Sequence, residues 1–166
     1  MDSRAILAEL PRLRRYARAM LGDRAAADDL VQDTLERAWR QIAQWQAGRE
    51  LRPWLFGIMH NLRVDQLRRG RLATAELDDS AEAVATRPTQ SDHLEVMDLE
   101  AALRQLPEEQ RAVLLLVGVE AMSYAEIAEA LAIPLGTVMS RLARGRERLR
   151  QILAGQSPVV NLRIVR

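Results

Sequence analysis

Two blocks of apolar residues at helical spacing, joined by a stretch that contains few of them, constrain this chain most strongly. In the first block apolar side chains recur every three to four positions over 5–21, 26–44 and 54–69, and the pattern returns from Leu94 onward. Such spacing places them on one face of an amphipathic helix. Glycine and proline are sparse, and no strand-like alternation precedes the C-terminal tail. The sequence therefore predicts an all-α fold with two folded domains.

The first block divides into three helices, which predict a compact N-terminal helical bundle over residues 1–72. Gly22 and Asp23 interrupt the apolar pattern, and a polar loop follows Gln44. Proline is favoured at the first position of a helix, so Pro53 is expected to open the third one. The residues predicted to face the core from the first two helices are Ile6, Leu10, Leu13, Ala17, Met20, Leu30, Val31, Leu35, Ala38 and Ile42.

The segment 73–94 has too few apolar residues to offset the entropy that ordering it would cost. It carries five acids against a single arginine, so it is expected to be a flexible acidic linker. The tail 154–166 contains two pairs of β-branched residues that suit either docking on a partner or a loose end, and its role stays open.

The second block, 95–153, has the layout of a helix-turn-helix domain. Ser123 is a good helix N-cap, and Glu126 stands at the position that completes a capping box. Ala132 and the two residues after it form a break, and a further helix begins near Leu135. If Ala132 has to be left-handed, its side chain costs about 1 kcal/mol. The stripe predicted to be buried on the last helix contains Val138, Leu142, Leu149 and Leu153.

The outer side of that last helix is rich in arginine. The residues that point away from the buried stripe, or flank it, are Met139, Ser140, Arg141, Arg144, Glu147 and Arg148. A short helix, a tight turn and a second helix with exposed arginines form the arrangement that reads DNA in the major groove. The alternative is a solvated helix end whose cations are favoured by the helix dipole. The capped two-helix layout upstream favours DNA.

The N-terminal bundle offers two further candidate surfaces. One is an acidic helix face whose members are three or four residues apart, namely Asp29, Gln32, Asp33 and Glu36. Such a face is either solvated or a contact for a partner. The other combines aromatic side chains, an amide and a basic stripe over 54–71, which suits single-stranded nucleic acid. Trp54 also lies at core spacing, so packing is an equal alternative for it.

Composition narrows the possible functions. The chain has no cysteine, which excludes disulfides and thiolate chemistry, and it lacks phosphate-loop, nucleophile-elbow and metal-ligand motifs. Neither an enzyme, a cofactor, a metal site nor a small-molecule substrate is therefore expected. No apolar run is long enough to span a bilayer and no signal peptide is recognised, which predicts a cytoplasmic protein without membrane insertion. The net charge of +1 conceals basic regions at 1–72 and 130–153 and an acidic one between them, which indicates more than one partner.

Both blocks resemble the sigma factors of bacterial RNA polymerase, within the sigma-70 family and its extracytoplasmic-function (ECF) group. The resemblance covers about residues 5–72 and 95–153. It is carried by the phrases "GDRAAADDLVQDTLERAWR", "LRPWLFGIMHNLRVDQLRR", "LPEEQRAVLLLVGVEAMSYAEIAEAL" and "GTVMSRLARGRERL". It implies sigma region 2 in the first domain and region 4 in the second. It also implies a protein that binds core RNA polymerase, recognises promoter DNA sequence-specifically and helps to melt it.

The same resemblance implies roles for particular residues. The surface for the β′ subunit of core polymerase would contain Asp29, Gln32, Asp33, Leu35 and Trp39. The part that binds the minus-ten element, with Asn61 accepting an extruded base, would contain Trp54, Asn61, Arg63, Arg68, Arg69 and Arg71. The reader of the minus-thirty-five element would contain Thr137, Ser140, Arg141, Arg144 and Arg148. The implied partners are core polymerase through its β′ and β subunits, promoter DNA and an anti-sigma factor.

One residue departs from the family, because Met139 stands where many relatives carry a basic side chain. Two other interpretations of the chain also stay open. An ordinary helix-turn-helix regulator would bind duplex DNA without polymerase. A sigma mimic would titrate an anti-sigma factor without directing initiation.

Overall fold

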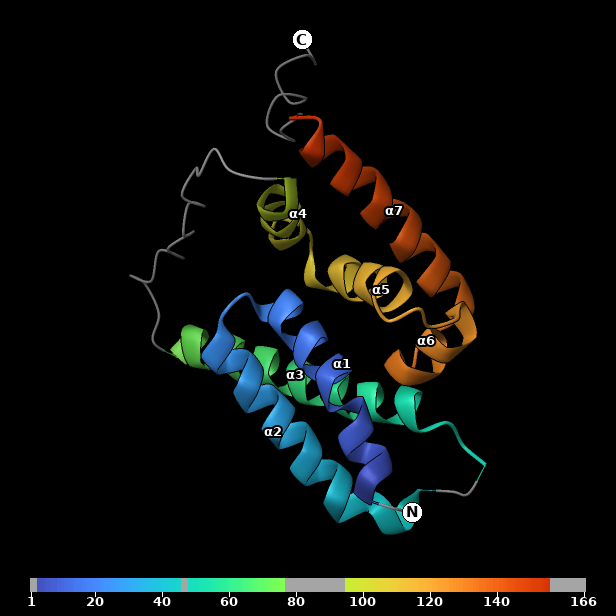
Figure 1. Ribbon diagram of the computed structural model, residues 1–166. Helices are drawn as coiled ribbons and strands as arrows, with labels where there is room; N and C mark the ends of the chain where they lie inside the picture. The colour runs from blue at the N-terminus through green and yellow to red at the C-terminus, as the bar shows by residue number, and fades with distance from the viewer. Residues whose placement is uncertain (1–2, 46–47, 77–94, 156–166) are drawn as a thin grey trace.

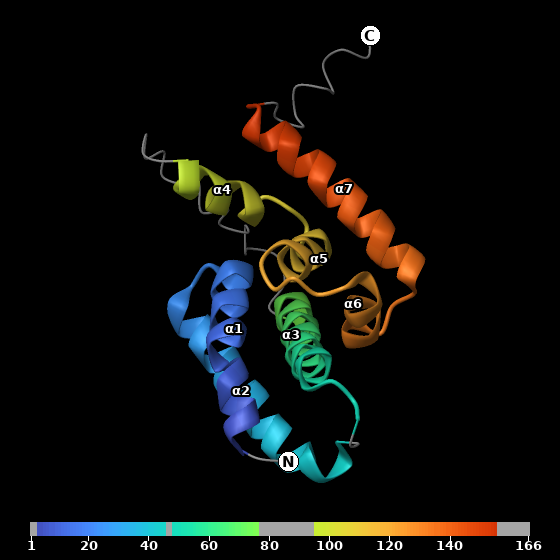
Figure 2. The same ribbon diagram turned by 45° about the vertical axis from the view of Figure 1, so that its right-hand side comes forward.

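The computed structural model describes residues 3–45, 48–76 and 95–155, and all regular secondary structure within them is helical (Figure 1). The predicted all-α fold is confirmed. In Figures 1 and 2 the first three α-helices occupy the lower part of the view. Of the last four, the helix Tyr124–Leu131 lies beside the third helix at about the same height, and the others lie above. The elements are α1 (Ser3–Leu21), α2 (Arg24–Gln41), the 3-10 helix η1 (Ile42–Gln44), α3 (Leu51–Glu76), α4 (Glu95–Arg104), α5 (Glu108–Gly118), α6 (Tyr124–Leu131) and α7 (Leu135–Leu153).

The N-terminal bundle, α1–α3, forms where the sequence places its apolar stripes. Ile6 and Leu13 of α1 are fully buried, as predicted, and α1 packs on α2 and α3. The turn between α1 and α2 depends on Gly22, whose φ of +72° costs glycine little. Asp23 then caps α2, because its side chain accepts a hydrogen bond from the amide of Ala25 at 3.3 Å. A glycine and an acid in succession thus end one helix and begin the next.

Two details of the predicted helices are wrong. α3 begins at Leu51 rather than at Pro53. Proline has no amide N–H to donate, but the first amides of a helix have no intrahelical acceptor, so Pro53 fits as the third residue of the helix. On α7, Leu153 is 51% exposed, whereas Gly145 is buried. A Cβ on Gly145 would lie 3.1 Å from a methyl carbon of Leu114. α5 therefore packs tightly against α7 at this glycine, whereas Leu153 at the end of the helix stays exposed.

Most of the predicted linker lies outside the described residues. The first four positions of 73–94 continue α3 to Glu76, and residues 77–94 are not described. Of the tail 154–166, only Ala154 and Gly155 are described. The predictions for both segments therefore stay predictions.

The second domain, α4–α7, contains the predicted helix-turn-helix in α6 and α7. The hydroxyl of Ser123 accepts from the amide of Glu126 at 3.1 Å, and the Glu126 carboxylate accepts from the amide of Ser123 at 3.4 Å. This is a complete capping box. Ala132 is left-handed, with φ 53° and ψ 48°, and the amide of Ile133 donates to the carbonyl of Ala128 at 3.1 Å. That hydrogen bond belongs to a Schellman motif, and it partly offsets the strain at Ala132.

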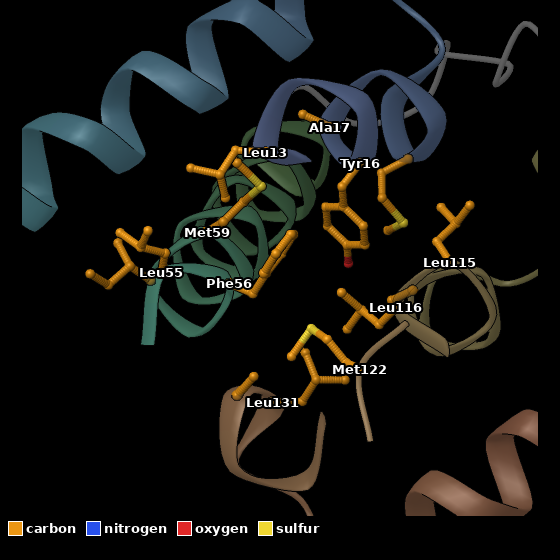
Figure 3. Packing of buried hydrophobic residues seen from close by; sticks show 14 of the residues in the cluster. Leu13, Tyr16, Ala17, Leu55, Phe56, Met59, Leu115, Leu116, Met122 and Leu131 are labelled. Atoms are coloured by element: carbon orange, nitrogen blue, oxygen red, sulfur yellow. The ribbon is translucent and has the colours of Figure 1, made fainter. Parts of the chain in front are cut away.

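The two domains pack against each other around one continuous apolar core. The rings of Tyr16 in α1 and Phe56 in α3 meet edge to face, with centroids 5.2 Å apart. Figure 3 shows Leu116 of the second domain beside this pair. The closest approach is between α3 and α6, where a Cβ on Gly57 would lie 3.0 Å from the carbonyl oxygen of Ala130. We call this packing of α1–α3 on α4–α7 the closed arrangement.

Ion pairs border the core that the domains share. Glu120, in the loop between α5 and α6, is completely buried, and its carboxylate accepts hydrogen bonds from Nε and Nη2 of Arg15 at 3.0 and 2.9 Å. This hydrogen bonding raises the pKa of Arg15 above its ordinary value. Arg63 of α3 similarly donates to Glu108 of α5 at 2.8 Å. Both pairs join one domain to the other, so separating the domains would leave each partner uncompensated until water reaches it.

Candidate protein and nucleic-acid interfaces

The acidic face of α2 points to solvent. Asp29, Gln32 and Asp33 are exposed, and within the described residues their side chains have no ion pair or hydrogen bond. Leu35 is half-buried, and Trp39 is 40% exposed. The opposite side of α2 packs on α1 and α3, so the helix is held in place while its acids stay accessible. An exposed indole next to unpaired carboxylates suits a protein partner with a cationic surface.

The residues predicted to bind the minus-ten element divide between two sides of α3. Arg63 faces α5, where it is bound to Glu108, and its side chain is only 26% exposed. Trp54 is half-buried and packs against the core. The structure thus leaves a smaller exposed set on α3, which contains Asn61, Arg68, Arg69 and Arg71. Asn61 and Arg68 are seven residues apart, and two helical turns bring them to the same side.

The residues predicted to read the minus-thirty-five element also divide. Thr137 is half-buried, and Arg141 lies 3.8 Å from the carboxylate of Glu109, with 24% of its side chain exposed. Arg150 is paired with Glu147 at 2.6 Å. The members that are exposed on α7 are Ser140, Arg144 and Arg148. Of these, the two arginines have no ion pair within the described part of the chain, so they remain available to phosphates or base edges.

An apolar pair at the start of α7 is exposed, and the sequence pattern predicts exposure only for its second member, Met139. Leu135 is 49% exposed and Met139 is 52% exposed, and they are one helical turn apart. Ala143 continues the stripe after another turn and is exposed as well. Apolar side chains on a helix that reads DNA suit the methyl group of thymine. The four-residue spacing is present in the sequence, but the helical pattern predicts Leu135 only as the start of the helix.

A groove of about 670 Å³ lies where the two domains meet. Residues that line it from the first domain include His60, Arg63, Arg68 and Arg71, and from the second Glu108, Glu109 and Arg141. Burial lowers the pKa of His60, and the charge of Arg141 lowers it further. The imidazole is therefore neutral near pH 7. In the closed arrangement Arg63 and Arg141, one from each predicted DNA surface, line the same groove.

The described residues offer neither a membrane-spanning segment nor a metal site. No helix among them has the length and apolarity needed to cross a bilayer. No three side chains of His, Asp or Glu among them gather closely enough to hold a metal ion.

Comparison with known protein families matches each domain separately. Residues 6–60 match the family described as the Sigma2 domain of PhyR, and residues 97–149 match Sigma-70, region 4. The order of the two matches is the order of the two domains. Fold and matches together define the class of protein as a two-domain factor of the sigma-70 type.

Relatives along nearly the whole chain narrow this class. The ECF RNA polymerase sigma factor EcfG of Rhodopseudomonas palustris (strain TIE-1) is 40% identical over 149 residues, which are 89% of this chain and 82% of the relative. The sigma factor RpoE of Bartonella quintana, solved in complex with the anti-sigma factor NepR, is 36% identical with a TM-score of 0.76. That match covers 91% of this chain and 95% of RpoE. CnrH, solved with the cytosolic domain of CnrY, is 25% identical with a TM-score of 0.68 over 93% of this chain and 88% of CnrH. The chain belongs to the family of ECF RNA polymerase sigma factors.

Proposed function

We propose that this protein is an alternative sigma factor that binds core RNA polymerase, recognises promoter DNA sequence-specifically and helps to melt it. The observation that carries the proposal is a pair of exposed surfaces of opposite charge on different domains. One is the acidic face of α2, and the other is the arginine face of α7. A subunit that joins an enzyme to DNA needs two such surfaces at once, because polymerase and promoter have to be held together.

We assign each part of the chain a role on this basis. Residues 1–72 bind core polymerase and the minus-ten element, 73–94 link the domains, and 95–153 bind the minus-thirty-five element. No role is assigned to 154–166. The bond-making chemistry of transcription belongs to the polymerase, and this subunit acts beside it in the cytoplasm.

In this proposal α3 supplies the contacts for the opened strand. The Asn61 amide offers both donors and an acceptor, which is what a pocket for an extruded base requires. Extruding a base costs a few kcal/mol, and its capture offsets part of that cost. Arg68, Arg69 and Arg71 neutralise nearby phosphates, and each such contact adds to the salt dependence of binding.

The closed arrangement is too small to reach both promoter elements. Elements centred at minus ten and minus thirty-five are about 25 base pairs apart, or about 85 Å along the helix axis. A compact protein of this length has a radius of gyration of about 15 Å. The domains therefore have to separate on the promoter, which would also release Arg63 and Arg141 from the groove between them.

An anti-sigma factor is the remaining proposed partner. RpoE was solved in complex with the anti-sigma factor NepR, and CnrH was solved with the cytosolic domain of CnrY. We extend this mode of control to the present chain. A protein that binds both domains in the closed arrangement would prevent the separation that the promoter requires.

Reconstituted transcription tests the proposal. Purified core polymerase, this protein and genomic promoter fragments should give specific transcripts, and a complex with core should elute from a sizing column. The match of residues 6–60 to a domain of PhyR favours one alternative, a sigma mimic. A mimic would bind the anti-sigma factor yet produce no transcript with core polymerase, and an ordinary regulator would bind duplex DNA with no complex with core. Either result would overturn the proposal.

A further inference from the structure

A second pocket lies between the C-terminal half of α1 and α4, which come close together in Figure 1. Its volume is about 670 Å³, and it shares no lining residue with the groove described above. Five arginines line it, and they are accompanied by a single carboxylate, that of Glu100. These arginines are Arg14, Arg15, Arg18, Arg24 and Arg104. Like charges around one concavity repel one another, so this arrangement becomes favourable when an anion enters.

The donors of this pocket are largely available. Arg14 and Arg24 are exposed and have no ion pair within the described residues. Arg18 lies 3.5 Å from Asp28 and Arg104 lies 3.9 Å from Glu100, and both separations are longer than a charge-assisted hydrogen bond of about 2.8 Å. Arg15 is the one member that is fully engaged, through its bonds to Glu120. A ligand would therefore displace few existing interactions.

The pocket exists only while the domains are packed together. Arg104 belongs to α4 of the second domain, whereas the other four arginines belong to α1 and the start of α2. Gly22 makes room for this approach, because a Cβ there would lie 3.1 Å from Nε of Arg104. A ligand held by both sides would consequently bind the closed arrangement and have no such site in an open one.

The donors and the shape indicate the class of ligand. Guanidinium groups bind phosphate oxygens through two parallel hydrogen bonds, and several of them together select a multiply charged anion. The volume is in the range of small-molecule sites. Duplex DNA is too wide to enter a pocket of this volume, whereas an exposed helix such as α7 can enter the major groove of DNA. Apolar lining from Pro11, Ala19 and Leu103 would suit a nucleoside attached to the phosphates.

We propose that this pocket binds an oligophosphate, free or carried by a nucleotide, and that the bound anion holds the two domains in the closed arrangement. It would bridge Arg14 and Arg24 of the first domain to Arg104 of the second. Because the anion binds one arrangement better than the other, it shifts the population toward the closed one. Binding is independent of promoter recognition; only an effect on transcription rests on the proposed function.

Titration calorimetry of the full chain tests the site directly. The probes are tripolyphosphate, ATP and adenosine, at constant ionic strength and without divalent cations. We expect one site per chain for the two phosphate compounds and none for adenosine. If ATP binds more tightly than tripolyphosphate, the apolar lining contacts the nucleoside. If the two affinities are equal, the site recognises the phosphates alone. Both results support the site. Absence of saturable binding for both would overturn it.

Matched variants distinguish a built site from general positive charge. Arg14→Ala and Arg104→Ala should each weaken tripolyphosphate binding by about tenfold or more, since each removes charge-assisted hydrogen bonds. Glu100→Gln should strengthen it by removing the one carboxylate. Arg37→Ala removes an exposed arginine elsewhere on α2 and should leave it unchanged. Equal weakening by Arg37→Ala would contradict the proposal, as would displacement of the probe by a duplex DNA fragment with the same dependence on Arg14.

Domain closure needs its own measurement. The chain has no cysteine, so Arg40→Cys on α2 and Leu153→Cys on α7 provide the only two thiols for a pair of fluorophores. Tripolyphosphate should increase the fraction of molecules with the short interdomain distance, and Arg104→Ala should abolish the increase. Binding without this shift would overturn the closure part. Since neither measurement contains polymerase or promoter, failure here and failure of the proposed function are separate results.

Discussion

At the scale of single residues, the two proposed interfaces differ in how far their charges are already satisfied. On α2, Asp29 and Asp33 are exposed and have no ion pair within the described part of the chain, so a partner meets them without breaking existing contacts. On α7 the arginines are of two kinds. Arg150 is held by Glu147, whereas Arg144 is exposed and unpaired within the described residues. Arg144 is therefore the more informative position for mutation.

Reversing one charge on α2 should weaken core polymerase binding. Asp33→Arg replaces an exposed carboxylate in the centre of the acidic face, so a cationic partner would meet repulsion instead of attraction. Binding to core polymerase, measured by fluorescence anisotropy, should fall, while DNA binding by the second domain should stay the same. Glu50→Arg makes the same charge change at an exposed position outside the face and is the control. If both variants lose affinity equally, the face has no special role.

Truncating one arginine on α7 should weaken promoter binding. Arg144→Ala should cost about 1–3 kcal/mol if the guanidinium contacts a base edge, and discrimination at that base pair should relax. Competition binding of the reconstituted holoenzyme to promoter fragments measures both effects. Arg150→Ala is the comparison, because Arg150 is already paired with Glu147 and should matter less. A loss of only a few tenths of a kcal/mol for Arg144→Ala would mean that it reads no base.

At the scale of elements, the turn of the helix-turn-helix carries strain that one substitution should relieve. Ala132 is left-handed, which suits glycine better than alanine by about 1 kcal/mol. Ala132→Gly should therefore raise the free energy of unfolding by up to that amount in urea titrations. Ala143→Gly, at an exposed position within α7, should lower it by about 1 kcal/mol because glycine disfavours helix interiors. If both variants change the free energy of unfolding in the same direction, Ala132 does not strain the turn.

The elements were largely predictable because their signals are local. The capping box at Ser123 and Glu126, the break at Ala132 and the apolar stripe of α1 each depend on residues within a few turns of one another. The errors arose where contacts with distant parts of the chain determine which residues are buried. Leu153 has the spacing of a buried residue, but Gly145 sets where α5 approaches, and nothing local to α7 indicates that.

The candidate site residues were predictable in kind and less so in accessibility. Exposure of Gln32, Asp33 and Arg144 agrees with helical periodicity, which the sequence contains. The half-burial of Arg63 and Arg141 does not follow from it. The acidic partner of Arg63 comes from the other domain, and that of Arg141 comes from α5, a different helix of the same domain. Their proposed roles in DNA binding remain predictions. Both roles require that the domains separate, because the two arginines line the groove between the domains in the closed arrangement.

At the scale of the whole molecule, two glycines of α3 should separate helix stability from domain packing. Gly70→Ala adds a methyl group in open space and should stabilise α3 by about 1 kcal/mol. Gly57→Ala gains the same free energy from the higher helix propensity of alanine. Its Cβ, however, would lie 3.0 Å from the carbonyl oxygen of Ala130, so α6 has to move. Such overpacking typically costs about 1–3 kcal/mol. We expect a larger radius of gyration by small-angle X-ray scattering for Gly57→Ala alone.

Indistinguishable scattering of the two variants, together with equal stabilisation, would mean that α3 and α6 do not approach this closely in solution.

The closed arrangement itself could not be read from the sequence. Tyr16, Phe56 and Leu116 each have the ordinary appearance of core residues of their own domain. Only the three-dimensional structure reveals that they belong to one shared core.

That shared core has a consequence for the lifetime of the protein in the cell. Separating the domains bares the apolar faces around Phe56 and Leu116 together with the carboxylate of Glu120. An opened molecule with no polymerase to cover these faces is a substrate for aggregation and for proteases that recognise exposed apolar segments. In the proposed function, the supply of free polymerase would then limit how many opened copies persist, and copies without polymerase would be protected in the closed arrangement.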